Sequence, residues 1–144
     1  MSETLLAEFR HYVGFSGEDS ACLAELHPVL APHFQRFSRE FYTAIERSPG
    51  ARSVLQGPEQ VERLKRTLVD WMSSGLRGPH DDEFVERRSR IGRRHVSIGL
   101  AQHYMFTAMN LMRNSYVEVI RRDMPESKQT AALLAVNRLF DLEL

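Results

Sequence analysis

The chain has 144 residues, with 19 Lys or Arg against 19 Asp or Glu, so its formal net charge is zero. This length suits one domain with a self-supporting core, and the even charge gives no global attraction to nucleic acid or to an anionic membrane. The single cysteine excludes an internal disulfide, and no apolar run is long enough for a membrane span. We therefore expect one cytoplasmic domain over residues 1–144, with neither nucleic acid nor a membrane as partner.

The first part of the chain predicts helices separated by prolines and glycines. After a short N-terminal turn, Ser16 caps a short helix, with Asp19 three residues later as in a capping box. Pro28 or Pro32 occupies the first turn of a second helix, which ends near Ser48. The apolar face of this second helix repeats at steps of three and four residues and comprises Phe34, Phe37, Phe41 and Ile45.

The rest of the chain continues the helical pattern, which makes the expected fold all-α. Gly57-Pro58 opens a third helix that ends at "GLRGPH", and a fourth runs from about Asp81. Gly99 separates it from a fifth helix over residues 100–122. Pro125 begins a sixth, which is still periodic in "NRLFDLEL" and has no capping glycine or polar tail. The chain therefore looks cut within a helix.

His95 lies at the C-terminal end of the fourth helix, within "IGRRHVSIGL". Helical steps place it on one face with Phe84, Ile91 and Ile98, so its imidazole leaves an apolar stripe and is expected to point inward. A histidine there either hydrogen-bonds to a neighbour as a core residue or gives its lone pair to a metal or substrate. Taken alone, the residue leaves both roles open, and the core role is the commoner one.

Two polar side chains lie among apolar ones on other helices. Tyr42 follows Phe41 in "REFYTAI" and either presents its phenol to an apolar space or sits at an edge with its hydroxyl in water. Thr67 stands between Leu64 and Leu68, where its hydroxyl either faces that space or bonds back to its own helix.

Haem fits this combination better than a bare metal ion does. Few acidic groups and no second histidine at metal spacing accompany His95, which disfavours zinc or di-iron. Haem iron brings porphyrin ligands and needs one neutral imidazole, a flat apolar slot and cations for its propionates. One or two members of an arginine cluster would supply that charge: Arg87, Arg88, Arg90, Arg93 and Arg94. An unopposed histidine also leaves the sixth iron position for a gas, toward which Tyr42 and Thr67 can donate hydrogen bonds.

Several segments resemble the globin domain of globin-coupled sensors: "FY" in the second helix, "RLKRTLVDW" in the third, then "ERRSRIGRRHVSIGL" and "YMFTAMN". The resemblance extends from "YVGFSGED" to "NRLFDLEL", and its pattern R..IG..H..IGL with an upstream FY is specific. It implies a globin fold with a shortened early region and two long last helices. It also implies b-type haem, iron protoporphyrin IX, that binds O2 or another diatomic gas. The domain itself would not be an enzyme, and as the N-terminal part of a longer signalling protein it would pass its state to a C-terminal output domain.

The resemblance also assigns roles by position. His95 would be the proximal iron ligand and Tyr42 the distal donor, with Leu64 and Thr67 on the distal side. The residues expected around the cofactor are Phe41, Tyr42, Leu64, Thr67, Leu68, Ile91, His95 and Ile98. One segment departs from the family, because "IGLAQHYM" lacks the proline of "IGL.P.WYM" and places Tyr104 one step early. A signalling contact from a proximal tyrosine is therefore not expected here.

The resemblance further implies a homodimer through the last two helices, as such sensors typically form. The fifth helix carries more apolar surface than one haem pocket needs, in Met109, Met112, Tyr116, Val119 and Ile120. This stripe either pairs two chains or packs inside its own domain.

Two other function classes compete with a gas sensor. A haem-free helical interaction domain would use His95 as a core residue and the arginines as a solvated or partner-binding face. A stand-alone haem enzyme would keep the pocket and change its purpose. The colour of the purified protein separates the first of these from a haem protein.

Overall fold

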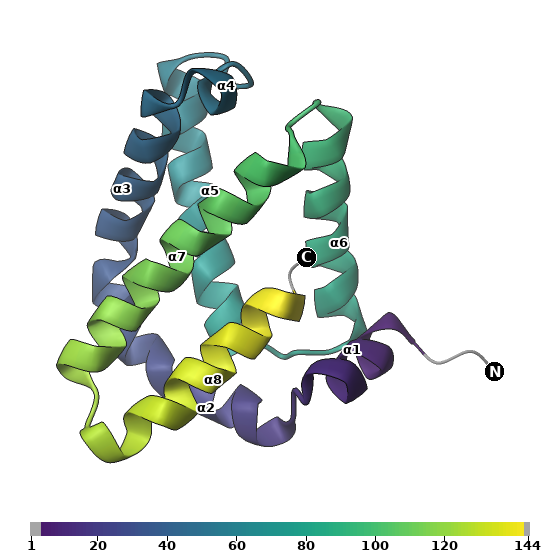
Figure 1. Cartoon of the computed structure of the whole chain (residues 1–144), viewed down its shortest axis with the longest axis vertical. Coiled ribbons are helices and arrows are strands. Elements are labelled where there is room, and N and C mark those ends of the chain that lie inside the picture. The colour runs from purple at the N-terminus through teal and green to yellow at the C-terminus, as the bar shows by residue number, and fades with distance from the viewer. Residues whose placement is uncertain (1–3, 143–144) are drawn as a thin grey trace.

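The computed structural model describes residues 4–142, and within that range every regular element is helical (Figure 1). This confirms the all-α prediction. The elements are α1 (Leu5–Val13), α2 (Gly17–Leu30), the 3-10 turn η1 (Ala31–His33), α3 (Phe34–Arg47), α4 (Pro49–Arg52), α5 (Pro58–Arg77), α6 (Asp82–Ser97), α7 (Gln102–Asp123) and α8 (Glu126–Leu142). None of the helices in the described range is both long and apolar enough to cross a bilayer.

The first helix is more regular than the short turn that the sequence predicts. The Thr4 side chain accepts a hydrogen bond of 3.2 Å from the backbone N–H of Ala7, which caps the start of α1. Gly14 ends the helix in the left-handed region with φ 75°, a conformation that glycine adopts without strain. A cap and a stop of this kind make a full helix of nine residues.

The boundary between α2 and α3 also differs from the prediction. The capping box at Ser16 is present, but α2 runs through Pro28 instead of a new helix beginning there. Proline removes one backbone donor, yet Leu26 and Leu30 are both 0% exposed, and their burial outweighs that loss. Pro32 falls in the 3-10 turn η1, and α3 starts only after it.

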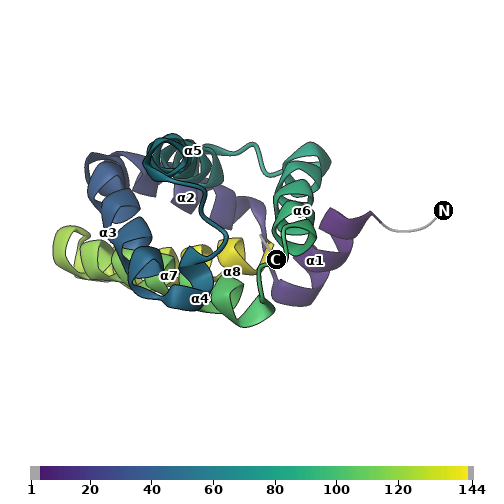
Figure 2. The same ribbon diagram turned by 90° about the horizontal axis from the view of Figure 1, so that it is seen from above.

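The core joins four helices through aromatic rings. Figure 2 shows α2 lying between α5 and α8, while α6 stands at the far side beside α1. The Phe37 ring of α3 lies 5.9 Å from that of Tyr116 on α7, and Tyr116 lies 5.5 Å from Phe140 on α8. Trp71 of α5 lies 6.0 Å from the same Phe140 ring. These tilted and edge contacts are the geometries that aromatic pairs prefer, and they hold the two sides of the domain together.

The apolar stripe of α7 belongs to this core. Met112 and Tyr116 are 1% exposed, and Val119 and Ile120 are 0% exposed. Met109 is partly buried against the same cluster. The interpretation of this stripe as surplus surface for a dimer is therefore wrong, because its residues pack inside their own domain.

Candidate functional site

His95 occupies the last turn of α6 and is half-buried. Burial lowers the pKa of its imidazole and the charge of Arg94 lowers it further, while a hydrogen bond to the Ile91 backbone acts in the opposite direction. The net direction keeps the ring neutral at pH 7. A neutral imidazole has a free lone pair on one nitrogen, which is the form that binds a metal.

The apolar stripe predicted around His95 is only half buried. Phe84 is 1% exposed, whereas Ile91 is 40% and Ile98 is 51% exposed. The last buried side chain of α6 is Arg88, and from there to the end of the helix none is buried. Phe84 therefore belongs to the core, whereas Ile91 and Ile98 are exposed at the surface of the domain, and their place beside a cofactor stays a prediction.

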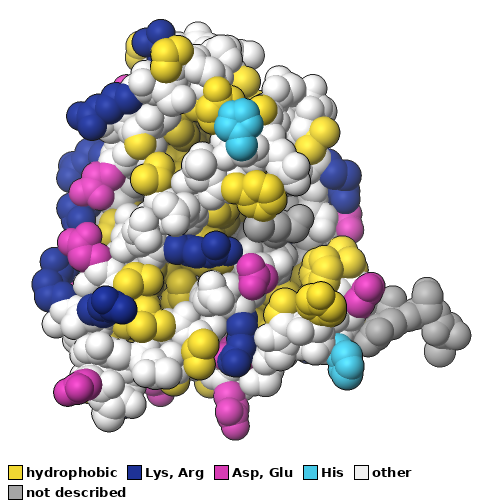
Figure 3. All heavy atoms as spheres, in the orientation of Figure 1, with side chains coloured by type: hydrophobic (Ala, Val, Ile, Leu, Met, Phe, Trp, Pro, Cys, Tyr) yellow, Lys and Arg dark blue, Asp and Glu magenta, His cyan; other side chains and the backbone are white. Residues whose placement is uncertain are grey.

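Large exposed apolar side chains are frequent between residues 91 and 111, the segment that contains His95. We call Ile91, Val96, Ile98, Phe106 and Leu111 the α6–α7 apolar surface; each is at least 38% exposed. Elsewhere in the described chain, only Leu5, Tyr12 and Leu134 are large, apolar and similarly exposed. Figure 3, which views the molecule from the side of α7, shows hydrophobic side chains reaching the surface on this face. Exposed apolar side chains of this kind are available to contact a bound apolar group.

Phe41 and Tyr42 of α3 lie inside the domain at 9% and 8% exposure, with their rings 5.1 Å apart. Burial raises the pKa of the Tyr42 phenol to about 12, so the hydroxyl keeps its proton as a hydrogen-bond donor. Among residues 4–142 this hydroxyl has no hydrogen-bond partner. A buried phenol without a protein partner is available to donate to a ligand.

The three predicted residues of α5 have different surroundings. Leu68 is 9% exposed, and Leu64 packs against the same buried cluster that contains Phe41 and Tyr42. Thr67 is exposed, and its hydroxyl donates a 3.1 Å hydrogen bond to the carbonyl oxygen of Arg63. The structure thus shows the back-bond that is the ordinary alternative for a threonine in a helix. The hydrophobic core therefore contains Phe41, Tyr42 and Leu68, with Leu64 packed against it, and Ile91 and Ile98 are not part of it.

The arginine cluster divides into three kinds of environment. Arg88 is 5% exposed, so it is not one of the one or two arginines that could reach a propionate at the rim. Arg87 pairs with Glu83 and Arg93 with Glu86 at the surface. The other two cluster members, Arg90 and Arg94, are exposed and form no ion pair with another described residue. They are the cations of this cluster that a propionate can recruit.

One contact near the start of α7 is absent from the sequence prediction. A Cβ added to Gly50 of α4 would lie 1.7 Å from the hydroxyl oxygen of Tyr104, so the phenol fits only because residue 50 has no side chain. The Tyr104 ring also lies 4.1 Å from that of His103. Tyr104 therefore packs across to α4. Only the unusual placement of a glycine within "SPGAR" hints at this in the sequence.

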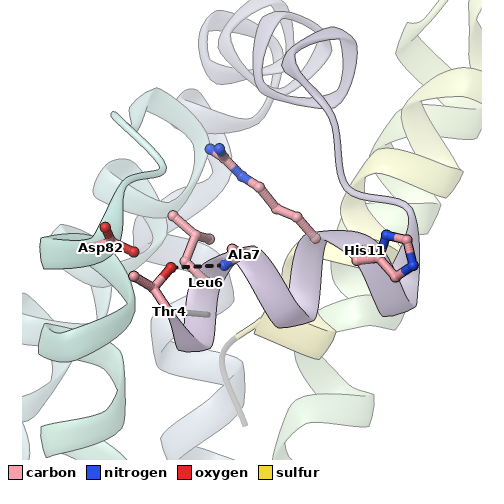
Figure 4. Close-up of a pocket in the computed structure, with 6 residues that line it drawn as sticks. Thr4, Leu6, Ala7, His11 and Asp82 are labelled. Carbon is pink, nitrogen blue, oxygen red and sulfur yellow. Dashed lines mark hydrogen bonds between the residues drawn. The ribbon is translucent and has the colours of Figure 1, made fainter. Parts of the chain in front are cut away.

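A separate hollow lies between α1 and the beginning of α6 (Figure 4). It is lined by Thr4, Leu6, Ala7, Arg10, His11 and Asp82. Thr4 is engaged in capping α1, and the Arg10 guanidinium donates to the carbonyl oxygen of His80. None of the predicted site residues lines this hollow.

The chemistry of the predicted site residues fits haem. They supply one neutral imidazole at His95, exposed apolar side chains on the same helix, and the cations Arg90 and Arg94, which form no ion pair within residues 4–142. Tyr42 on α3 adds a protonated phenol without a hydrogen-bond partner in the same range. Haem requires one imidazole ligand because the porphyrin supplies the equatorial nitrogens. No group of three or more His, Cys, Asp or Glu side chains between residues 4 and 142 is arranged to hold a metal ion.

Known proteins match the chain along almost its whole length. The Protoglobin family model matches residues 2–144. The haem-based aerotactic transducer HemAT of Halobacterium salinarum is 23% identical over 140 residues, which are 96% of this chain and 29% of HemAT. The chain therefore spans less than a third of that relative.

Solved structures give the same result for the fold. The globin domain of the Geobacter sulfurreducens globin-coupled sensor superposes with a TM-score of 0.91 at 26% identity, covering 99% of this chain and 93% of that one. The ferric globin domain of E. coli DosC superposes with a TM-score of 0.77 at 19% identity, covering 96% and 93%. These matches confirm the globin fold expected from "FY" and R..IG..H..IGL. The chain belongs to the protoglobin family and is a globin domain of the globin-coupled sensor type.

Proposed function

We propose that this domain senses O2 or another diatomic gas through b-type haem held by His95. The observation that carries the proposal is the neutral, half-buried imidazole of His95 beside the α6–α7 apolar surface. When bound, haem iron supplies an open coordination position for the gas. The similarity to a haem-based aerotactic transducer and to the globin domain of a globin-coupled sensor supports this function. The absence of CxxCH supports a b-type cofactor that is not covalently attached.

The residues around the site have separate tasks in this proposal. His95 supplies the proximal nitrogen, and its interaction with the Ile91 backbone restrains the rotation of the ring. Phe41, Leu64 and Leu68 contribute apolar walls, as do Ile91 and Ile98 on the proximal side. Arg90 and Arg94 are placed at the exposed edge of α6, where propionates need cations.

Tyr42 is the residue that would distinguish a gas-filled pocket from an empty one. Its hydroxyl retains its proton and has no partner among the described residues, so it is free to donate a hydrogen bond to a polar diatomic gas. A ligand shifts a conformational equilibrium only by binding two states differently, and this bond supplies such a difference. Thr67 contributes a second bond only if its hydroxyl leaves the carbonyl oxygen of Arg63.

The signal would leave through the last two helices to a C-terminal output domain. Sequence resemblance to globin-coupled sensors supports a homodimer through α7 and α8. Exposed Leu111 on α7 and Leu134 on α8 are apolar side chains that such a contact would cover. Substitution Leu134→Arg should then lower the dimer fraction measured by sedimentation, and an unchanged sedimentation coefficient would argue against this face.

An absorption spectrum tests the cofactor assignment. Wild type purified with hemin should show a Soret band that shifts on reduction and on addition of carbon monoxide, whereas His95→Ala should lose most of its haem. His103→Ala is the matched control, because His103 is an exposed histidine of the neighbouring helix. A colourless wild type, or a His95→Ala variant that retains haem like wild type, would contradict the proposal. A colourless wild type would favour the haem-free interaction domain instead.

A further inference from the structure

Arg88 opens the R..IG..H segment, and the structure places its side chain in the interior instead of at a propionate. We propose that Arg88 is a positioning residue that fixes His95 relative to α5. This inference rests on the proposed function, since it concerns the proximal ligand of the cofactor. It changes the role of Arg88 from a surface cation to an anchor between two helices.

The contacts of Arg88 hold its guanidinium from several directions. One terminal nitrogen donates to the carbonyl oxygen of Trp71 and to the hydroxyl oxygen of Ser74, both at 2.9 Å. The guanidinium carbon lies 4.8 Å from the centre of the Trp71 ring and 4.7 Å from that of Phe84. Charge-assisted hydrogen bonds and two aromatic faces suit a planar guanidinium and do not suit the compact ammonium of lysine.

Because Arg88 and His95 lie on the same helix, the contacts of Arg88 also affect the position of the His95 imidazole. Arg88 is the last buried side chain of the helix, and His95 follows about two turns later on nearly the same face. The intervening part of α6 contains no buried side chain. Any rotation or shift of α6 at Arg88 is therefore carried by the rigid helix to the His95 imidazole.

The helix that Arg88 contacts, α5, also carries residues of the predicted distal side. Trp71 and Ser74 belong to α5, which also carries Leu64 and Leu68 of the predicted distal side. Arg88 thereby ties the helix of the proximal ligand to the helix of the distal wall. This bond sets the register between the two sides of the site and leaves the propionates to exposed cations such as Arg90 and Arg94.

Three variants test this role. Arg88→Met keeps an unbranched side chain but removes the charge and all donors, and Arg88→Lys keeps the charge without the planar fork. Arg87→Met is the matched control, because Arg87 is an exposed arginine whose 3.0 Å ion pair is with Glu83 of its own helix. We measure the rate of haem transfer to excess apomyoglobin and the iron–histidine stretching band of the deoxygenated ferrous protein by resonance Raman spectroscopy.

Arg88→Met should raise the haem-transfer rate about tenfold, the lower end of the loss in metal affinity seen when groups orienting a ligand are removed. It should also shift or broaden the iron–histidine band. Arg88→Lys should lie between it and wild type, and Arg87→Met should match wild type. In the haem-free protein, amide hydrogen exchange over residues 89–97 should be faster in Arg88→Met than in Arg87→Met, a readout that needs no cofactor.

A purely structural Arg88 would give a different result. Arg88→Met would then lower the melting temperature while the iron–histidine band and the haem-transfer rate stayed at wild-type values, which would overturn the inference. If Arg88→Met does not fold, Ser74→Ala replaces it, because it removes one acceptor from an exposed position and should shift both readouts in the same direction by less. Unchanged readouts in Ser74→Ala would overturn the inference too. Failure of the proposed function is a different result: the absorption spectra would then show that wild type does not hold haem through His95.

Discussion

The hydroxyl of Ser38 donates a 2.9 Å hydrogen bond to the backbone carbonyl oxygen of Lys65, and so ties α3 to α5. Ser38 is 2% exposed and lies one helical turn before Tyr42. The bond therefore fixes the face of α3 that carries the proposed distal donor. This bond positions α3 against α5 on the distal side, as the hydrogen bonds of Arg88 position α6 against α5.

Replacing Ser38 by alanine should lower the free energy of unfolding by about 1 kcal/mol, because one buried hydrogen bond is lost without a large change in volume. Chemical denaturation of the haem-free protein measures this. Ser53→Ala is the control, since the Ser53 hydroxyl bonds to Gly50 within one exposed turn. Equal stabilities of the two variants would show that the contact between helices contributes nothing measurable.

Tyr42→Phe should retain haem and release oxygen faster than wild type. The expected acceleration is about tenfold, which corresponds to the loss of one hydrogen bond of about 1.4 kcal/mol. Stability should not fall, because the phenol has no partner among the described residues and its burial at 8% exposure is a cost that phenylalanine avoids. Stopped-flow oxygen dissociation and thermal melting measure the two effects. An unchanged dissociation rate would remove Tyr42 from the gas site.

Local signals in the sequence predict most of the helices. Gly57 and Pro58 mark the start of α5, and the side chain of Asp81 caps α6 with a bond to the Phe84 N–H. Such caps act within a few residues, so they are visible in the sequence. The assignment of His95 as the iron ligand comes from its motif and stays a prediction.

The features that the sequence does not show depend on contacts between distant segments. Five arginines look alike in "ERRSRIGRR", and the contacts of Arg88 with Trp71 and Ser74 on another helix distinguish it from the rest. Periodicity places Ile91 on the face of Phe84, but it does not show which part of that face the domain itself buries. The apolar face of α7 is equally ambiguous, because a core and an interface require the same residues.

Gly50→Ala should destabilise the domain by about 1 kcal/mol, since the new methyl group occupies the place of the Tyr104 hydroxyl and forces that side chain to move. Tyr104→Ala in the same chain should remove the conflict. A double-mutant cycle measured by denaturation should therefore give a coupling energy of similar size. Additive effects of the two substitutions would mean that Tyr104 moves aside freely.

His80 forms a buried junction between α2 and α5. Its Nε2 lies 2.7 Å from the carbonyl oxygen of Gly75, and its Nδ1 lies 2.7 Å from the hydroxyl oxygen of Ser20. A carbonyl only accepts, so Nε2 carries the proton and the Ser20 hydroxyl donates to Nδ1 in the neutral ring. The neutral form thus satisfies both nitrogens at 4% exposure.

Protonation of His80 should therefore oppose folding. Burial lowers the pKa of this imidazole, and the charges of Arg10 and Arg88 lower it further, against the raising effects of the Gly75 carbonyl and Asp81. Because the folded pKa lies below that of the unfolded chain, the unfolded chain binds the proton first as the pH falls. The stability that His80 contributes is complete above about pH 6.5 and is lost below it, as the pH falls through the folded pKa.

His80→Gln should flatten this dependence, because glutamine does not titrate. Between pH 7 and pH 5, the free energy of unfolding of wild type should fall more steeply than that of His80→Gln, by at most about 1.4 kcal/mol per pH unit for one proton. Urea denaturation of the haem-free protein at several pH values measures both slopes without interference from His95 ligation. His11→Gln is the control, because it removes an exposed histidine. Parallel slopes for wild type and His80→Gln would mean that the buried ring accepts a proton in the folded domain as readily as in the unfolded chain.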